Sequence, residues 1–483
     1  MDLLKLLQQE LTITNTKGGK YYATTYNSNL DFFTTSKRYM ADDEIKALFN
    51  AAFSENKEIA VANLLHTLDI RGGKGERKEF KLCFKELCGL DKEMSTVVLH
   101  LIGNLGRFDY VLVGLGTPIE AEVVDLIKKQ LESDLNSEHV SLLAKWLPSL
   151  RTHNKNNVLA KRLVKLLGMS EKDYRKTLVS LRTKINIIEK NLTERQYDKI
   201  NFEEVPSKAM LKYTNSFNEN MGEKYIKYLV DLKNGKVEVK TTGLFAYEII
   251  KAVCSDDESK IALADEMWKN QKDLIGNNDA NILVVADTSA SMTWDDMIPF
   301  STAIGLAIYF AERNKGMFKD HFITFSSRPI LQRLIGDTLH EKVENIEKIA
   351  ENTDIDEVFR LLLETAIKNK LSQKDMPEQI IIISDMEFDY GVYSKGGTNF
   401  HGWKQTFSEF NYDLPKIVFW NVAGASRGVP ATIHDDVIMV SGFSTNIFEN
   451  ILNVEEFSPV PFMCQTLQKY IDMYENTQKQ LFL

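Results

Sequence analysis

The chain has 483 residues, 43% of them hydrophobic, and a formal net charge of −9. This composition predicts a globular protein of two or three domains with enough apolar side chains to build its cores without disulfide staples. No apolar run approaches the roughly 18 residues of a membrane span, Met1–Lys5 lacks the start of a secretory signal, and the four cysteines form no Cys-x-x-Cys pair. We therefore expect neither a membrane segment nor zinc, and a cytoplasmic location, or a virion if the source is viral.

The charges are distributed unevenly along the chain. Residues 1–277 contain 42 Lys and Arg against 39 Asp and Glu, whereas the remaining residues contain 17 against 29. Within residues 151–200 the count is 13 basic to 5 acidic residues. Such a block is either a solvated helical face or a surface for nucleic acid or an acidic partner.

The first 275 residues predict a series of amphipathic helices. Apolar residues fall on one stripe between Asp42 and Phe53, Thr117–Glu120 has the pattern of a capping box, and apolar residues recur every three or four positions from Tyr174 to Leu192. Serial helices with short connections indicate an all-helical, HEAT-like repeat array. Asn234-Gly235 is the one place where the pattern favours a local hairpin.

Residues Arg71–Arg77 have the sequence Arg-Gly-Gly-Lys-Gly-Glu-Arg. A phosphate-binding P-loop would place Ser or Thr after its Lys and would follow a strand, and this segment does neither, so we expect no nucleotide site here. The segment reads as a helix–helix turn in which Gly72 and Gly73 allow positive φ. Contact with RNA phosphate or with a partner remains the alternative.

After a turn-rich linker at residues 276–280, the apolar run Ile282–Ala286 predicts a central strand of a parallel sheet. Asp287, Ser289 and Ser291 follow it directly, so that one carboxylate and two hydroxyls can face one point. Oxygen ligands with little net charge suit Mg²⁺ or another hard divalent cation. The pattern resembles the Asp-x-Ser-x-Ser signature of von Willebrand factor A domains and their metal-ion-dependent adhesion site.

That resemblance implies two further ligands, a Thr and an Asp downstream. Thr353 precedes an amphipathic helix, and Asp385 ends the second buried strand, Gln379–Ser384. The predicted metal ligands are therefore Asp287, Ser289, Ser291, Thr353 and Asp385. The segment Met386–Phe410, inserted after Asp385, is a candidate rim over the metal.

Three further strands are expected at His321–Phe325, Lys416–Trp420 and Val437–Val440, which makes the carboxyl-terminal part a doubly wound α/β domain. A last apolar-periodic helix runs past Met463 to Tyr474. The predicted organisation is a helical array over residues 1–277, a von Willebrand A-like domain over 278–455, and a terminal helix over 456–483 that packs back on the rest.

Four phrases in the helical half carry a second resemblance. They are Arg71–Arg77, Lys145–Ser149 (Lys-Trp-Leu-Pro-Ser), Tyr174–Leu178 and Val205–Met210. Together with the metal motif they resemble an uncharacterised Ro-like family found in viruses and cells. That family is similar to the Ro autoantigen (TROVE) proteins, which bind RNA and in which a ring of helical repeats is closed by a von Willebrand A domain.

Two functions are consistent with these observations. The first is a non-enzymatic scaffold, such as a viral structural component, whose metal accepts an acidic side chain of a partner protein. The second is Ro-like binding of structured or misfolded RNA by the helical part. Catalysis ranks below both, because no histidine lies within the motif and His401 and His434 are far along the chain. The candidate RNA or partner contacts are Arg71, Lys74, Arg77, Lys161, Arg162, Lys165, Arg175, Lys176 and Arg182.

Overall fold

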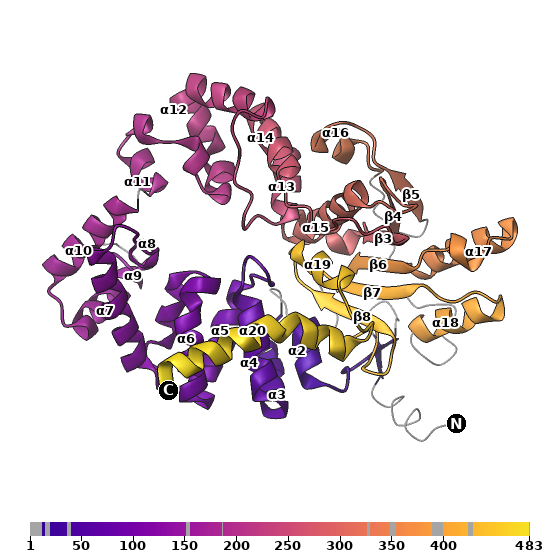
Figure 1. Cartoon of the computed structure of the whole chain (residues 1–483), viewed down its shortest axis with the longest axis horizontal. Coiled ribbons are helices and arrows are strands. Elements are labelled where there is room, and N and C mark those ends of the chain that lie inside the picture. Colours follow the sequence, from indigo (N-terminus) through magenta and orange to yellow (C-terminus); the bar gives the residue numbers. More distant parts are fainter. Residues whose placement is uncertain are drawn as a thin grey trace.

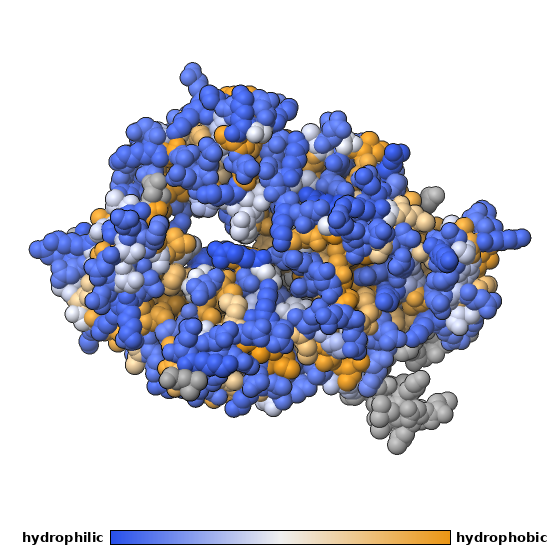
Figure 2. All heavy atoms as spheres, viewed as in Figure 1, coloured by the Kyte–Doolittle hydropathy of each residue, from blue (hydrophilic) through white to orange (hydrophobic). Residues whose placement is uncertain are grey.

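The computed structural model describes residues 12–14, 20–35, 40–150, 155–185, 187–325, 329–347, 354–388, 399–423 and 428–482. Its helices follow one another around an arc, and both ends of the arc meet an α/β part that contains the main sheet (Figure 1). The chain therefore closes on itself, and the space-filling view shows an opening through the middle bordered mostly by hydrophilic side chains (Figure 2). The fold class predicted from the sequence, a helical array followed by an α/β domain, is confirmed.

The helical part begins with a short antiparallel pair, β1 (Thr12–Thr14) and β2 (Lys20–Tyr22). Its helices are α2 (Ser28–Thr35), α3 (Asp42–Glu55), α4 (Lys57–Leu68), α5 (Arg77–Leu90), α6 (Lys92–Leu105), η1 (Phe108–Gly114), α7 (Glu120–Asn136), α8 (Leu143–Trp146), α9 (Lys155–Leu167), α10 (Glu171–Lys184), α11 (Ile188–Thr193), η2 (Tyr197–Lys199), η3 (Phe202–Glu204), α12 (Ser207–Lys233), α13 (Ala246–Val253) and α14 (Glu258–Lys269). No helix among the described residues is long and apolar enough to cross a membrane.

Single capping residues explain the tight connections of this array. Asn56 ends α3 and begins α4, and its side chain accepts hydrogen bonds from the backbone N–H groups of Glu58 and Ile59. Asp91 does the same between α5 and α6, where it accepts from Met94 N. Because one residue both stops a helix and satisfies the free N–H groups of the next, consecutive helices turn back on each other without a loop.

Three local predictions for the helical part are wrong. The capping box at Thr117 does not form, since the Thr117 hydroxyl donates to Gly114 O and α7 begins without a side-chain cap. The stripe from Tyr174 to Leu192 is divided between α10 and α11. Asn234-Gly235 ends α12 in a turn instead of forming a hairpin, because no strand follows it to pair.

The main sheet has six strands in the order β5-β4-β3-β6-β7-β8. All neighbours are parallel except β5, which pairs antiparallel with β4 at one edge. The strands are β3 (Ile282–Asp287), β4 (His321–Phe325), β5 (Ile330–Arg333), β6 (Gln379–Ser384), β7 (Lys416–Asn421) and β8 (Val437–Ser441). The two central strands are almost wholly buried, as expected for a parallel sheet covered on both faces.

The connections supply the covering helices. They are η4 (Ala290–Met292), α15 (Trp294–Arg313), α16 (Leu339–Glu344), α17 (Asp356–Asn369), η5 (Gln373–Asp375), α18 (Asn399–Glu409), α19 (Asn446–Leu452) and α20 (Pro459–Phe482). The last of these, α20, leaves the sheet and runs along α4 and α6 of the helical part (Figure 1).

The first joint between the two parts surrounds a buried lysine. Lys74, only 1% exposed, donates from Nζ to the carbonyl oxygen of Phe33 at 2.6 Å. Ser441, the last residue of β8, donates to the same oxygen at 2.9 Å. Burial lowers the pKa of Lys74, and the nearby carboxylates of Glu79 and Glu76 oppose that shift. One carbonyl oxygen thus ties the glycine-rich turn, the first helices and the sheet edge together.

Helix α20 completes this joint. Tyr470 donates its hydroxyl to Asp69 Oδ2 at 3.0 Å, and Lys469 donates Nζ to Gly72 O at 3.0 Å. Burial, with the Asp69 carboxylate adding to it, raises the pKa of Tyr470 well above its ordinary value, so the hydroxyl stays protonated and donates. The end of the chain is therefore fixed to the turn between α4 and α5.

The glycines of this turn act differently from the prediction. Gly75, with φ +66°, is the residue in the left-handed region, and Gly72 and Gly73 are not. Gly73 is needed for space, because a Cβ there would lie 2.1 Å from His66 O and 2.9 Å from the Tyr470 hydroxyl. Expecting positive φ at Gly72 and Gly73 was wrong, since close packing against α4 and α20 was invisible from the local sequence.

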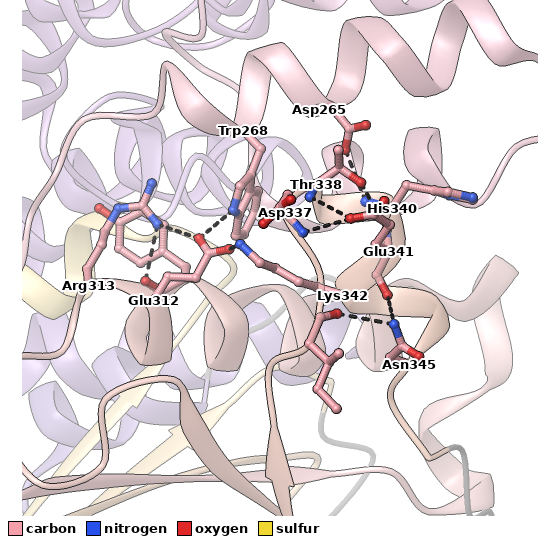
Figure 3. Close-up of polar contacts among 12 residues, drawn as sticks. Asp265, Trp268, Glu312, Arg313, Asp337, Thr338, His340, Glu341, Lys342 and Asn345 are labelled. Carbon is pink, nitrogen blue, oxygen red and sulfur yellow. Dashed lines mark hydrogen bonds and ion pairs between the residues drawn. The ribbon is translucent and has the colours of Figure 1, made fainter.

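The second joint is a polar network between α14, α15 and α16 (Figure 3). Glu312 of α15 accepts from Trp268 Nε1 at 2.7 Å and from Lys342 Nζ at 2.8 Å. Asp265 of α14 accepts from the backbone N–H of His340 at 3.0 Å. The network lies beside the close packing of α13 on α15, so the helical part is fixed to the sheet at both ends of the arc.

We expect Gly73→Ala to lower the free energy of unfolding by about 1–3 kcal/mol, because the added methyl collides with backbone and a buried hydroxyl. Gly89→Ala is the matched control. A Cβ at Gly89, inside α5, meets nothing within 4 Å. Gly89→Ala should therefore raise the free energy of unfolding by up to about 1 kcal/mol, because Ala favours the helix over Gly. Thermal and urea unfolding of both variants measure this, and equal stability of the two would contradict the role given to Gly73.

Candidate metal centre

The loop after β3 gathers oxygen atoms around a buried carboxylate. Asp287 is fully buried, and its Oδ1 accepts from the backbone N–H of Ser289 at 2.9 Å. The hydroxyls of Ser289 and Ser291 lie 3.0 Å apart. The loop turns back immediately because Ala290–Met292 forms a single 3-10 turn. Three of the five predicted ligands thus occupy one short loop at the carboxyl end of a central strand, where open parallel sheets place their sites.

Asp385 reaches the same region from the neighbouring strand. Strand β6 pairs in parallel with β3, with Ala286 opposite Ile383, so both strands deliver their following residues to the same edge. Asp385 is 3% exposed, and its Oδ1 accepts from the backbone N–H of Glu387 at 2.9 Å. Its negative charge acts directly on Asp287.

Ser384 belongs to this cluster but was absent from the predicted ligand set. Its hydroxyl donates to Asp287 Oδ2 at 2.5 Å and accepts from Met386 N at 3.0 Å. The hydroxyl therefore fixes the orientation of one Asp287 oxygen from the adjacent strand. The available signal was its position, since a hydroxyl residue directly before a carboxylate at the end of the next parallel strand falls beside the first site.

The electrostatics of the cluster are unfavourable without a cation. Burial, then the Asp385 carboxylate, raises the pKa of Asp287 to about 7, while hydrogen bonds from Ser384 and Ser289 oppose the shift. Among the described residues no Lys, Arg or His forms an ion pair with either carboxylate. Two carboxylates and two hydroxyls are a suitable donor set for a hard divalent cation. The described part of the chain contains no group of three or more His, Cys, Asp and Glu side chains placed to hold a metal ion.

One predicted ligand, Thr353, and part of the predicted rim, Met386–Phe410, lie outside the described residues. Thr353 lies outside the described residues, and α17 begins shortly after it at Asp356. Of the predicted rim, residues 389–398 are also outside, whereas the rest includes the helix α18. The side chain of His401 belongs to the undescribed set as well.

The segment leaving the loop has an unusual backbone. Asp295, Asp296 and Met297 have φ of 47°, 57° and 59°, a left-handed turn at the start of α15. Non-glycine residues reach this region at a cost of about 1–2 kcal/mol each. Asp296 forms an ion pair with Lys251 of α13, which links the loop region to the helical part.

The amino-terminal segment supports the other side of the cluster. Tyr22 and Val429 exchange two backbone hydrogen bonds, at 3.0 and 2.8 Å. Next to this bridge the Tyr21 hydroxyl accepts from the backbone N–H of Phe388 at 2.7 Å, three residues after Asp385. The first described residues of the chain thus pack on the α/β part beside the candidate site.

The predicted basic contacts divide into three groups. Lys74 is buried in the joint, and Arg182 donates to Ala144 O, Leu147 O and Ser149 Oγ. Neither side chain is free to bind RNA. The prediction that these two residues contact RNA or a partner is therefore corrected. Arg162 pairs with Glu120, and Arg71 donates to Asn104 O. The remaining five are exposed: Arg77, Lys161, Lys165, Arg175 and Lys176.

Comparisons with known proteins find relatives without a described activity. Residues 281–480 match a Domain of unknown function (DUF7788), and residues 121–298 match another (DUF2828). The chain is 30% identical over 503 residues to Uncharacterized protein L728 of Acanthamoeba polyphaga mimivirus, covering 94% of this chain and 87% of that protein. A search of solved structures finds the RO (RSR) protein of Deinococcus radiodurans, with a TM-score of 0.48 and 12% identity over 91% of this chain and 96% of that chain.

The Asp287 pKa predicts a pH-dependent stability in chelator. The pKa of Asp287 in the folded chain, about 7, lies above its ordinary value of 3.8. The contribution of Asp287 to the free energy of unfolding is therefore fully present below pH 3.8 and is lost as the pH rises through about 7. Asp287→Asn removes this loss, so its melting temperature should exceed that of the wild type more at about pH 8 than at about pH 5. Asp413→Asn, at an exposed position of the same domain, should show no such trend. If Asp287→Asn raised the melting temperature equally at both pH values, the raised pKa assigned to Asp287 would be contradicted.

Proposed function

This chain belongs to the same family as the mimivirus protein L728, and we propose that it is a non-enzymatic binding scaffold that engages an acidic partner protein through a divalent cation. The observation that carries the proposal is the meeting of Asp287 and Asp385 at the ends of two adjacent parallel strands, with Ser289 and Ser291 beside them. Mg²⁺ is the cation that this oxygen set suits best.

Each residue of the cluster has a distinct part in the proposal. Asp287 and Asp385 supply the negative charge that holds the cation, and Ser289 and Ser291 supply neutral oxygens. Ser384 keeps one Asp287 oxygen in place through its hydrogen bond. Two carboxylates balance the charge of a divalent cation, but with the two hydroxyls they leave positions of an octahedral Mg²⁺ open, so the bound cation can still accept a further carboxylate oxygen as a ligand. An aspartate or glutamate of a partner is the group that fits this requirement.

Catalysis has less support than binding. Hydrolysis by a metal-bound water needs a positioned acid or base. Of the histidines with described side chains, none hydrogen-bonds to Asp287, Asp385, Ser289 or Ser291. The cluster is therefore better suited to binding a partner's carboxylate through a cation than to catalysing hydrolysis.

Titration of the full chain with MgCl₂ by calorimetry tests the cation. We expect one site in the wild type, loss of the heat signal in Asp287→Asn and Asp385→Asn, and unchanged binding in Asp413→Asn. Ser384→Ala should bind roughly ten- to a hundredfold more weakly, because one hydrogen bond to an ionised ligand is worth roughly 1.5–3 kcal/mol. Wild-type binding retained in both aspartate variants would contradict the site.

Partner capture from the source then tests the acidic ligand. Bound protein should be released by chelator and absent with Asp287→Ala, whereas Arg175→Glu at an exposed position of α10 should leave it bound. Release by salt alone, with no effect of chelator, would argue for the second candidate function.

That second candidate is RNA binding by the helical part, favoured by one observation. Lys161 and Lys165 of α9 and Arg175 and Lys176 of α10 are exposed and have no ion pair within the described residues. Helices α9 and α10 are in contact, so these four cations lie on neighbouring helices. The net charge of −9 opposes a polyanion, which ranks this function second.

Filter binding of a structured RNA at about 50 and about 200 mM salt, with and without chelator, separates the two functions. The first function predicts weak binding that Lys165→Glu with Arg175→Glu does not change. Tight binding that falls steeply with salt, ignores chelator and is lost in the double variant would reverse the ranking.

A further inference from the structure

A second site candidate lies in the helical part, far from the metal cluster in sequence. A cavity of about 1080 Å³ opens between α5, η1, α8, α9, α10 and the segment around α11. One wall is the complete segment Lys145–Ser149, one of the sequence phrases with no role in the functions above. The volume is at the upper end of ligand pockets and holds several amino-acid side chains.

Two long side chains of α10 hold that wall in place. Tyr174 is buried and donates its hydroxyl to Pro148 O at 2.8 Å. Arg182 donates to Ala144 O, Leu147 O and Ser149 Oγ, each at 2.8 Å. The wall is therefore preformed and does not need a ligand to order it, which lowers the entropic cost of binding.

A fixed cation lies against Trp146 of this wall. Arg107 donates from Nε and Nη2 to the two oxygens of Asp109 at 2.9 and 2.8 Å, and its guanidinium lies 3.7 Å from the centre of a Trp146 ring. Asp109 and Trp146 thus hold the guanidinium in one plane. Trp146, the only aromatic residue of the lining, has one face covered by this contact.

The lining combines an apolar floor with a cationic excess. Leu112, Val113, Leu147 and Ile187 contribute apolar surface, and Lys81 and Lys190 add positive charge. In total the lining has five cationic residues against three carboxylate residues, an excess of two positive charges in a chain whose net charge is −9. The cavity attracts a ligand that is apolar in its middle and moderately acidic at its ends.

We propose that this cavity is a docking site for an acidic peptide segment of a partner protein, which inserts an aliphatic or aromatic side chain against Leu112 and Leu147 and places a flanking carboxylate near Lys190. Lys145 already pairs with Glu189, at 3.6 Å. A nucleic-acid strand fits less well. It needs free aromatic faces for its bases, and Asp109, Glu189 and Glu194 in the lining repel its phosphates. This site is independent of the proposed cation.

Fluorescence anisotropy of the full chain tests the proposal, with chelator present throughout so that a cation site cannot contribute. The probes are a nonapeptide pool with Leu or Phe at the centre and Asp or Glu flanks, the same pool with Lys or Arg flanks, and a ten-residue oligouridine. The acidic pool should bind best, at least about tenfold more tightly than the basic pool.

Val179→Glu provides a variant that keeps the fold. Val179 lines the cavity but is 63% exposed, so the fold tolerates a carboxylate there. The new negative charge should lower the affinity for the acidic peptide pool about tenfold. Val158→Glu on α9, at a 74% exposed position outside the lining, is the matched control and should bind like the wild type. No preference for the acidic pool, equal binding by the two variants, or tighter binding of oligouridine would overturn the proposal.

Discussion

The joint that brings the two ends of the chain together is built around one buried ammonium group. An isolated lysine costs several kcal/mol to bury, and Lys74 meets that cost with the Phe33 carbonyl and the neighbouring Glu76 and Glu79. Because Ser441 donates to the same carbonyl oxygen, removing the ammonium would also loosen the edge strand β8. The turn that presents Lys74 exists only because Gly73 lets α4 and α20 approach closely.

Two unlike joints make the ring a rigid support. The joint around Lys74 is buried and joins segments from both chain ends, whereas the network around Glu312 is only partly buried and joins consecutive helices (Figure 3). Together they fix the candidate metal site around Asp287, on the sheet, and the cavity along Lys145–Ser149, on the arc, relative to each other. A partner with two acidic segments would gain from this fixed geometry, because binding at one site raises the effective concentration at the other.

The cluster of oxygen atoms around Asp287 contains local features that oppose folding. Two carboxylates that repel each other in a buried loop, followed by a left-handed turn at Asp295–Met297, both oppose folding. Local conflicts of this kind concentrate at functional sites. The supporting contacts come from distant segments, with Ser384 on the next strand and Tyr21 near the amino terminus. The surroundings of the cluster therefore include the amino-terminal segment as well as the α/β part.

The sequence by itself determined the fold class, the core strands and the loop that carries Asp287, Ser289 and Ser291, because hydrophobic period and oxygen-rich spacing are local properties. It also located Asp385, since a second apolar strand ending in a carboxylate is equally local. The helix break before α11, the unmade capping box at Thr117 and the partner of Lys74 were decided by tertiary packing. The spacing of residues along the sequence does not identify the distant backbone groups that a side chain will contact. The charge pattern predicted Lys74 and Arg182 as surface contacts. In the folded chain Lys74 is buried, and Arg182 donates to two backbone carbonyl oxygens and one hydroxyl oxygen.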